Sequence, residues 1–184
     1  MKVGVIVGSL RADSINRRLS RALMRLAPSA WTFEQIEIHQ LPLYNQDNDG
    51  APPPEAVRLK QHVESVDALM FLTPEYNRSM PGVLKNALDT ASRPYGKNSF
   101  AGKPAGVIGA SIGSIGTAVA QQHLRNVLAY LDVPTMGQPE AFIHLTEGKI
   151  DAAGEVSDDK LRSVLQRWVD AYQQFVEAHV GNAR

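Results

Sequence analysis

The sequence predicts an α/β protein built on a parallel five-stranded sheet with helices on both faces. Short apolar runs alternate with amphipathic helical patterns along all 184 residues. Parallel strands need a long crossover between them, usually a helix, so this alternation is typical of the class. A chain of this length fits one domain better than two, and we expect a single domain over residues 1–184.

The strands are predicted from apolar or partly alternating runs, and the helices from apolar positions that recur on one face. The predicted strands are residues 2–7, 32–38, 68–73, 105–110 and a short strand within 138–144. The predicted helices are residues 15–26, 54–65, 81–91 (with Pro81 at its first position), 117–131 and a last helix capped by Ser157. The long apolar stripe of the last helix indicates core packing or a subunit contact.

Composition excludes several classes of protein. The chain has no cysteine, which rules out disulfides, thiolate metal sites, iron–sulfur clusters and thiol nucleophiles. Lys and Arg total 19, as do Asp and Glu, and a net charge of zero argues against nucleic-acid or anionic-membrane partners. The longest uncharged run, between Lys103 and Arg125, is broken by Pro104 and four glycines, so no membrane span is expected. We expect a soluble cytoplasmic protein.

Ligands of such a sheet bind at the carboxyl ends of its strands, so function is sought in the loops that follow them. The loop after the first strand, residues 8–16, has the composition of an anion site. Free N–H groups at a helix start favour an anion, and Arg11 can bind a phosphate bidentately. We expect Arg17 and Arg18 to add positive potential. The alternative is ordinary capping, in which Asp13 or Ser14 caps the helix and Ser9 only turns the chain. For Asp13 itself we expect capping, with the side chain pointing outward.

Two further loops carry weaker signals. In the loop after the third strand, residues 73–82, Tyr76 either covers a flat ring or packs as an ordinary loop tyrosine. In the loop after the fourth strand, residues 110–117, Gly113 and Gly116 permit close backbone approach to a ligand or serve turns only. Neither the GxxxxGK[ST] phosphate loop nor the GxGxxG dinucleotide turn occurs in the chain. None of the histidines has metal-ligand spacing, so no metal is expected.

Three motifs occur together: Gly8-Ser9-Leu10-Arg11-x-x-Ser14-x-Asn16, Pro74-Glu75-Tyr76-Asn77, and Leu84-Lys85-Asn86-Ala87-Leu88-Asp89. In this combination the chain resembles the NADPH-dependent FMN reductases, and most of all their chromate or quinone reductase branch. The resemblance spans nearly the whole chain. It implies a flavodoxin-like three-layer sandwich of strand order 2-1-3-4-5, with FMN held non-covalently at the strand ends and NADPH or NADH as co-substrate.

The resemblance also implies residue roles. The residues implied to hold the FMN phosphate are Ser9, Arg11, Ser14, Ile15 and Asn16. Those implied to hold the ring and ribityl chain are Pro74, Glu75, Tyr76 and Asn77, with Ser111, Ile112 and Gly113 along the other ring edge. Arg78 and Arg93 are assigned to the substrate, because with Lys97 they can make the pocket mouth positive; the alternative is plain surface charge. Relatives are usually homodimers or homotetramers, and Arg125 is a candidate interface residue.

The chemistry then takes place on the flavin N5, and no catalytic protein side chain is required. Two electrons pass from NAD(P)H to a quinone in ping-pong order, with chromate, azo compounds or free flavin as further acceptors. Three alternatives are a flavodoxin-type electron carrier, a non-enzymatic flavin-binding regulator, and a serine hydrolase using Ser9. The neutral charge and Arg11 argue against the carrier, and the lack of a GxSxG motif argues against the hydrolase.

Overall fold

Five parallel strands form one sheet in the order β2-β1-β3-β4-β5, as expected. The computed structural model describes residues 1–181 of the chain. The strands are β1 Lys2–Val7, β2 Thr32–Gln35, β3 Ala68–Leu72, β4 Ala105–Ser111 and β5 Phe142–His144. The strand order changes direction between β1 and β3, which are direct neighbours. The chain adds β2 on one side of β1 and then β3, β4 and β5 on the other. Ligands of open α/β sheets bind at this switch point.

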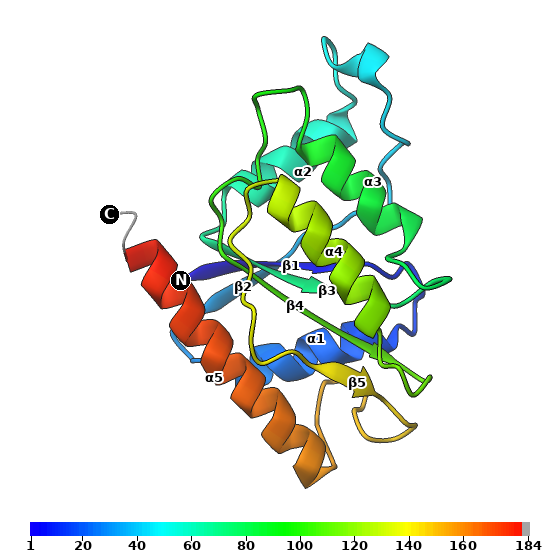
Figure 1. Cartoon of the computed structure of the whole chain (residues 1–184), viewed down its shortest axis with the longest axis vertical. Helices are drawn as coiled ribbons and strands as arrows, with labels where there is room; N and C mark the ends of the chain where they lie inside the picture. Colours follow the sequence, from blue (N-terminus) through cyan, green and yellow to red (C-terminus); the bar gives the residue numbers. More distant parts are fainter. Residues whose placement is uncertain (182–184) are drawn as a thin grey trace.

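The helices cover both faces of the sheet and complete three layers (Figure 1). On one face lie α1 Ile15–Leu26 and α5 Asp159–Gly181, and on the other lie α2 Pro54–Glu64, α3 Gly82–Ala91 and α4 Ala118–Tyr130. Each helical layer closes its own apolar core against the sheet. The flavodoxin-like architecture is therefore confirmed. Across residues 1–181, no helix combines the length and the apolar character needed to cross a membrane.

The apolar stripe of α5 is core packing. Trp168 and Tyr172 are fully buried and stack on each other, with ring centroids 5.3 Å apart. The Tyr172 hydroxyl donates a hydrogen bond to the carbonyl of Leu69 in β3, at 2.8 Å. Gly106 of β4 lies directly beneath, where a Cβ would come within 2.7 Å of the Tyr172 ring. The last helix thus completes the core rather than presenting its stripe to a partner.

Several predicted element ends were wrong, most of them by one residue, and three of them have a clear physical reason. The edge strand β2 stops at Gln35, not at residue 38, because its pairing with β1 ends there. Pro81 is the N-cap of α3 and not its first helical residue. The cap of α5 is Asp158, whose Oδ1 accepts from the Leu161 N–H at 2.8 Å. Ser157 instead donates its hydroxyl to the carbonyl of Gly148, at 3.0 Å.

Candidate active site

The three loops singled out in the sequence lie together at the carboxyl edge of the sheet. They follow β1, β3 and β4, which are neighbours in the sheet, and they meet at the right of Figure 1. Two long-range contacts tie them to one another. Asn16 at the start of α1 is hydrogen-bonded to Ala110 at the end of β4. Glu75 after β3 is hydrogen-bonded to the first turn of α4, which follows the third loop.

The β1–α1 loop forms a cradle of backbone donors. Ser14 is the N-cap of α1, and its hydroxyl oxygen accepts from the Arg17 N–H at 3.4 Å. Ser9 is buried and accepts from the Arg11 N–H at 3.4 Å. Within residues 1–181, the backbone N–H groups of residues 12–16 have no acceptor. Such a set of unpaired donors at a helix start is suited to an anion.

The charged side chains around this cradle are arranged differently from the expectation, because most of them pair with one another or with a neighbouring carboxylate. Asp13 does not cap the helix; its carboxylate is 71% exposed and accepts from Arg18 Nε at 3.0 Å. The hydrogen bond from Arg18 lowers the pKa of Asp13 below its usual range, and the Arg18 charge acts in the same direction. Arg17 lies 3.8 Å from a carboxylate oxygen of Glu37. Of the three arginines, only Arg11 has no ion-pair partner among the described residues.

The side chain of Asn16 is used inside the protein. It is buried, donates to the Ala110 carbonyl at 3.0 Å and accepts from the Ala110 N–H at 2.9 Å. Its backbone N–H is one of the unpaired donors above. Nothing in the spacing of the first motif distinguishes these two uses, because the partner lies 94 residues away.

The β3–α3 loop contains a tight turn that exposes an aromatic ring. Tyr76 and Ser79 exchange two backbone hydrogen bonds, of 2.9 and 3.0 Å, around Asn77 and Arg78. Both central residues have positive φ angles, 51° and 65°, as a mirror-image hairpin turn requires. Positive φ is unusual for arginine, and backbone strain of this kind gathers at functional sites. Tyr76 is 49% exposed, which favours ring covering over packing.

The two glycines of the β4–α4 loop have different roles. At Gly116, with a φ of 60°, a Cβ would lie 2.6 Å from the Phe142 backbone, so this glycine is required by β5. At Gly113 a Cβ would meet only the Ser111 hydroxyl, at 3.5 Å, and the backbone faces open space. Beside it, Ile112 exposes 80% of its surface. Gly113 therefore leaves room for a flat ligand, whereas Gly116 is structural.

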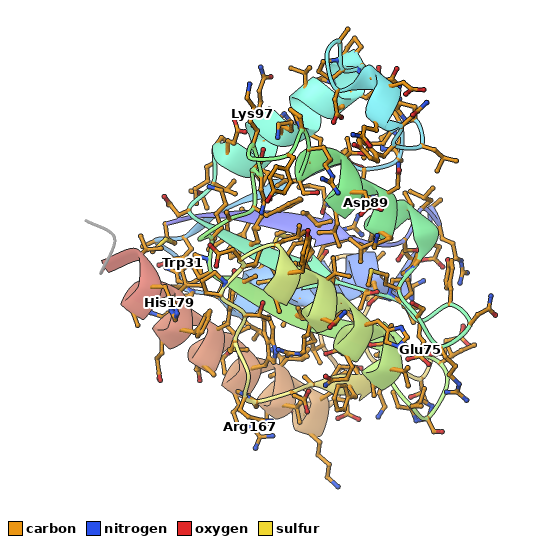
Figure 2. All side chains as sticks on the ribbon, turned by 45° about the horizontal axis from the view of Figure 1, so that its top comes forward. Trp31, Glu75, Asp89, Lys97, Arg167 and His179 are labelled. Atoms are coloured by element: carbon orange, nitrogen blue, oxygen red, sulfur yellow. The ribbon has the colours of Figure 1, made fainter. Side chains whose placement is uncertain are left out.

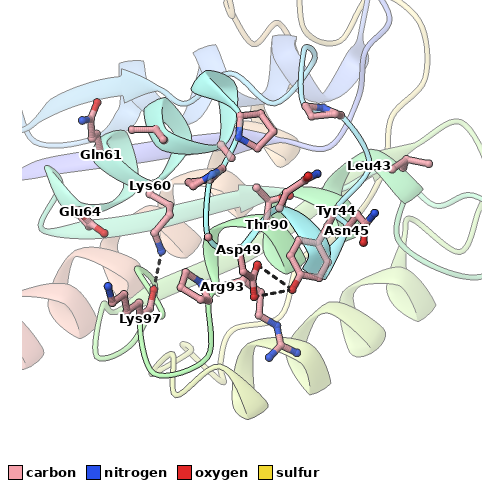
Figure 3. A pocket seen from close by; sticks show the side chains of 18 residues that line it. Leu43, Tyr44, Asn45, Asp49, Lys60, Gln61, Glu64, Thr90, Arg93 and Lys97 are labelled. Carbon is pink, nitrogen blue, oxygen red and sulfur yellow. Dashed lines mark hydrogen bonds between the residues drawn. The ribbon is translucent and has the colours of Figure 1, made fainter.

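Arg93 lies apart from these loops. It follows the far end of α3, a helix of ten residues and hence about 15 Å long. There it lines a cavity of about 420 Å³ between α2 and the loop of residues 41–53 (Figure 3). Asn86, from the third motif, holds that loop by accepting from the Tyr44 N–H at 2.8 Å and donating to the Pro42 carbonyl at 2.9 Å.

Lys97 lies in the same cavity, where its carbonyl accepts from Lys60 Nζ at 2.6 Å. Figure 2 shows Lys97 and Glu75 on opposite sides of the molecule. Neither Arg93 nor Lys97 therefore joins Arg78 at the strand ends of its own chain.

These loops fit FMN. The unpaired N–H groups of residues 12–16, with Arg11 beside them, suit a phosphate, and the exposed Tyr76 ring and open Gly113 backbone suit a flat heterocycle. Fold and site together define a flavin-binding protein of the flavodoxin-like class. A model of the NADPH-dependent FMN reductase family matches residues 1–148. The chain belongs to this family.

Individual relatives agree with this. The chain is 52% identical to a 2-hydroxy-1,4-benzoquinone reductase of a Burkholderia species, over 96% of both chains. It is 46% identical to a quinone reductase of Pseudomonas putida, over 95% of this chain and 94% of the other. It superposes on FerB, a flavoenzyme NAD(P)H:(acceptor) oxidoreductase from Paracoccus denitrificans, with a TM-score of 0.93, at 46% identity over 97% and 98% of the chains.

The predictions of family, enzyme class and cofactor are thereby confirmed. The protein is an oxidoreductase that uses FMN with NAD(P)H. A serine hydrolase does not agree with the buried Ser9, whose hydroxyl oxygen accepts from a backbone N–H.

Proposed function

We propose that the protein is a cytoplasmic NAD(P)H-dependent quinone reductase with a single FMN-binding domain. One observation carries the proposal: a cradle of unpaired backbone donors at the start of α1 lies at the same sheet edge as the exposed ring of Tyr76. Relatives at 52% and 46% identity that are named quinone reductases support the acceptor class.

When bound, FMN takes two electrons from NAD(P)H and returns them to the acceptor in ping-pong order, so the chain needs only to bind and orient. Ser9, Arg11, Ser14 and the N–H groups of Ile15 and Asn16 hold the phosphate. Along the ring, the proposed contacts come from Pro74, the backbone of Glu75, Tyr76 and Asn77 on one side and from Ser111, Ile112 and Gly113 on the other.

Quinones are the proposed physiological acceptors, with chromate, azo compounds and free flavin as further ones. The position of Arg78 supports the proposal of anionic acceptors, since 69% of its side chain is exposed at the tip of the Tyr76–Ser79 turn. Arg93, at the far end of α3, lies too far from the strand ends of its own chain to act on a substrate there.

We further propose a homodimer or homotetramer with Arg125 at a subunit contact. Burial lowers the pKa of Arg125, and the nearest carboxylate oxygen, on Glu140, is 3.9 Å from its Nε. Its Nη1 donates to the Met136 carbonyl at 2.7 Å, while Nε and Nη2 have no acceptor in residues 1–181. Light scattering on Arg125→Gln should then show smaller particles than the parent protein; an unchanged mass would count against this contact.

The function is tested on the purified holoprotein. We expect a yellow protein whose flavin bands bleach on anaerobic titration with NADPH and return on addition of 1,4-benzoquinone. Initial rates at several NADPH and quinone concentrations should give parallel double-reciprocal lines. Bleaching by NADPH without turnover on any quinone would leave an electron carrier or a regulator as the better description.

A further inference from the structure

Helix α4 begins without a cap of its own. Its N-cap residue, Thr117, has φ 77° and ψ 18°, a left-handed conformation that is rare for a β-branched residue. The Thr117 side chain caps nothing, because its hydroxyl accepts from Gln121 Nε2 at 3.0 Å. The first N–H groups of a helix have no partner within the helix, and ordinarily the N-cap side chain supplies one. Another part of the chain must do so here.

Glu75 supplies the missing cap from the loop after β3. Its Oε2 accepts from the N–H groups of Val119 and Ala120, both at 3.1 Å. Only 7% of the Glu75 side chain is exposed. Figure 2 shows the residue beside the first turn of α4. A carboxylate at this position satisfies two donors and also opposes the positive end of the helix dipole.

The second carboxylate oxygen of Glu75 contacts Arg78. Oε1 lies 3.4 Å from Nη1 of Arg78, whose side chain is 69% exposed. An ion pair at this distance with a mostly exposed arginine contributes little to stability. The cap, with two well-formed hydrogen bonds in a buried setting, is therefore the main contact of the Glu75 side chain.

A second contact fastens the same loop to α4. Ser79 Oγ and His123 Nδ1 lie 3.0 Å apart, one helical turn beyond the residues that Glu75 caps. The loop that presents Tyr76 is thus attached to α4 at two points. Because α4 directly follows the loop of Ser111–Gly113, both ring-binding loops are held in one fixed relation.

We propose that Glu75 is a positioning residue, whose carboxylate caps α4 and thereby sets the spacing between the Tyr76 turn and the Ser111–Gly113 loop. The side chain acts on the ligand through these two loops. This inference rests on the proposed function insofar as the two loops hold the flavin ring. The capping role itself does not depend on a ligand.

The test compares Glu75→Ala with Glu75→Gln, and uses Glu55→Gln as a matched control. Glu55 also lies 3.4 Å from an arginine three residues later, Arg58, but caps no distant helix. Two quantities are measured for each: amide hydrogen exchange at Val119 and Ala120 in the apoprotein, and the FMN dissociation constant with the visible circular dichroism of the bound flavin.

We expect Glu75→Ala to speed exchange at both amides, to raise the FMN dissociation constant about tenfold, the scale of a lost cap, and to change the flavin dichroism. Glu75→Gln keeps an acceptor oxygen, so its amide exchange and its FMN dissociation constant should lie close to those of the parent. Glu55→Gln should match the parent in both. Unchanged exchange in Glu75→Ala would overturn the cap. Faster exchange with unchanged FMN affinity and dichroism would overturn the positioning role. Failure of the parent protein to bind FMN would instead refute the proposed function, with the exchange result still standing.

Discussion

Asn16 and Ala110 exchange two hydrogen bonds that join the start of α1 to the end of β4. The side-chain amide donates to the carbonyl at 3.0 Å and its oxygen accepts from the N–H at 2.9 Å. The pair is buried, so no water replaces either bond. It fixes the donor cradle of residues 12–16 relative to the β4–α4 loop, across which a bound FMN would extend.

Asn16→Leu should therefore weaken both folding and cofactor binding. It leaves the N–H and carbonyl of Ala110 without the side-chain partners that they have in the parent, a loss of about 2–3 kcal/mol in the free energy of unfolding. Urea denaturation of the apoprotein measures this loss, and fluorescence titration measures the FMN affinity.

The control for this prediction is Asn98→Leu. Asn98 also makes two such bonds, donating to the Leu131 carbonyl at 2.6 Å and accepting from the Phe100 N–H at 3.0 Å, but far from the strand-end loops. It should lose stability and keep its FMN affinity. Equal losses of affinity in the two variants would show that Asn16 has no particular role at the site.

Gly109→Ala should be strongly destabilising. A Cβ at this position of β4 would lie 2.2 Å from the Thr73 carbonyl oxygen and 2.4 Å from the Thr117 hydroxyl. The backbone has to shift, at a cost of about 1–3 kcal/mol. Both contacts belong to segments that flank the loops proposed to hold the ring, so the FMN affinity should fall as well.

Gly82→Ala is the matched substitution, and it should stabilise the protein where Gly109→Ala destabilises it. Gly82 is the first residue of α3, and an added Cβ meets nothing within 4 Å. The substitution should raise the free energy of unfolding by a few tenths to about 1 kcal/mol, chiefly by restricting the unfolded chain. A Gly109→Ala protein as stable as Gly82→Ala would contradict the predicted clash.

Asp158 makes stability depend on acid pH. Its pKa lies below the ordinary 3.8, first because Lys149 hydrogen-bonds to it and then because the Leu161 N–H does. On unfolding the pKa returns to the ordinary value. The contribution of the Asp158 carboxylate to the free energy of unfolding is therefore complete above about pH 5, and it is lost as the pH falls through the lower pKa of the folded state.

Melting temperatures of the parent and Asp158→Asn between neutral pH and about pH 2 test this prediction. The parent should be the more stable at neutral pH, and the difference should shrink below about pH 4. A difference that stays constant with pH would mean that the carboxylate charge plays no part.

Arg78→Ala should discriminate between acceptors. The guanidinium is exposed at the tip of a turn beside the proposed ring site, so it can attract chromate but has little to offer a neutral quinone. The KM for chromate should rise several-fold more than the KM for 1,4-benzoquinone, and more so at low ionic strength. Equal changes for both acceptors would refute this role.

Much of the fold follows from local patterns in the sequence. The buried strands β1, β3 and β4 appear as apolar runs, and the helices show their buried faces as regular apolar spacing. Cap positions are less predictable, because two adjacent residues can both serve: Asp13 or Ser14 at α1, Ser157 or Asp158 at α5. Which of them caps depends on where the chain turns, and that is set by contacts elsewhere.

The organisation of the site is even harder to predict from the sequence. Asn16 and Glu75 belong to motifs whose resemblance implies ligand contact, yet both side chains bond to backbone of remote elements. Their partners are 94 and 44 residues away, beyond any local signal. The left-handed Thr117 could not be expected either, since β-branched residues disfavour that conformation.

The N-termini of α1 and α4 both face this edge of the sheet, and they are not equivalent. That of α4 is already neutralised by the chain's own Glu75, whereas the donors at the start of α1 are free. Between these two helix starts, an anionic group is favoured at α1 and repelled at α4. The chain's own acidic side chain thus gives the site a direction, in which a ligand with an anionic tail and an aromatic head would place its tail at α1 and its head toward α4.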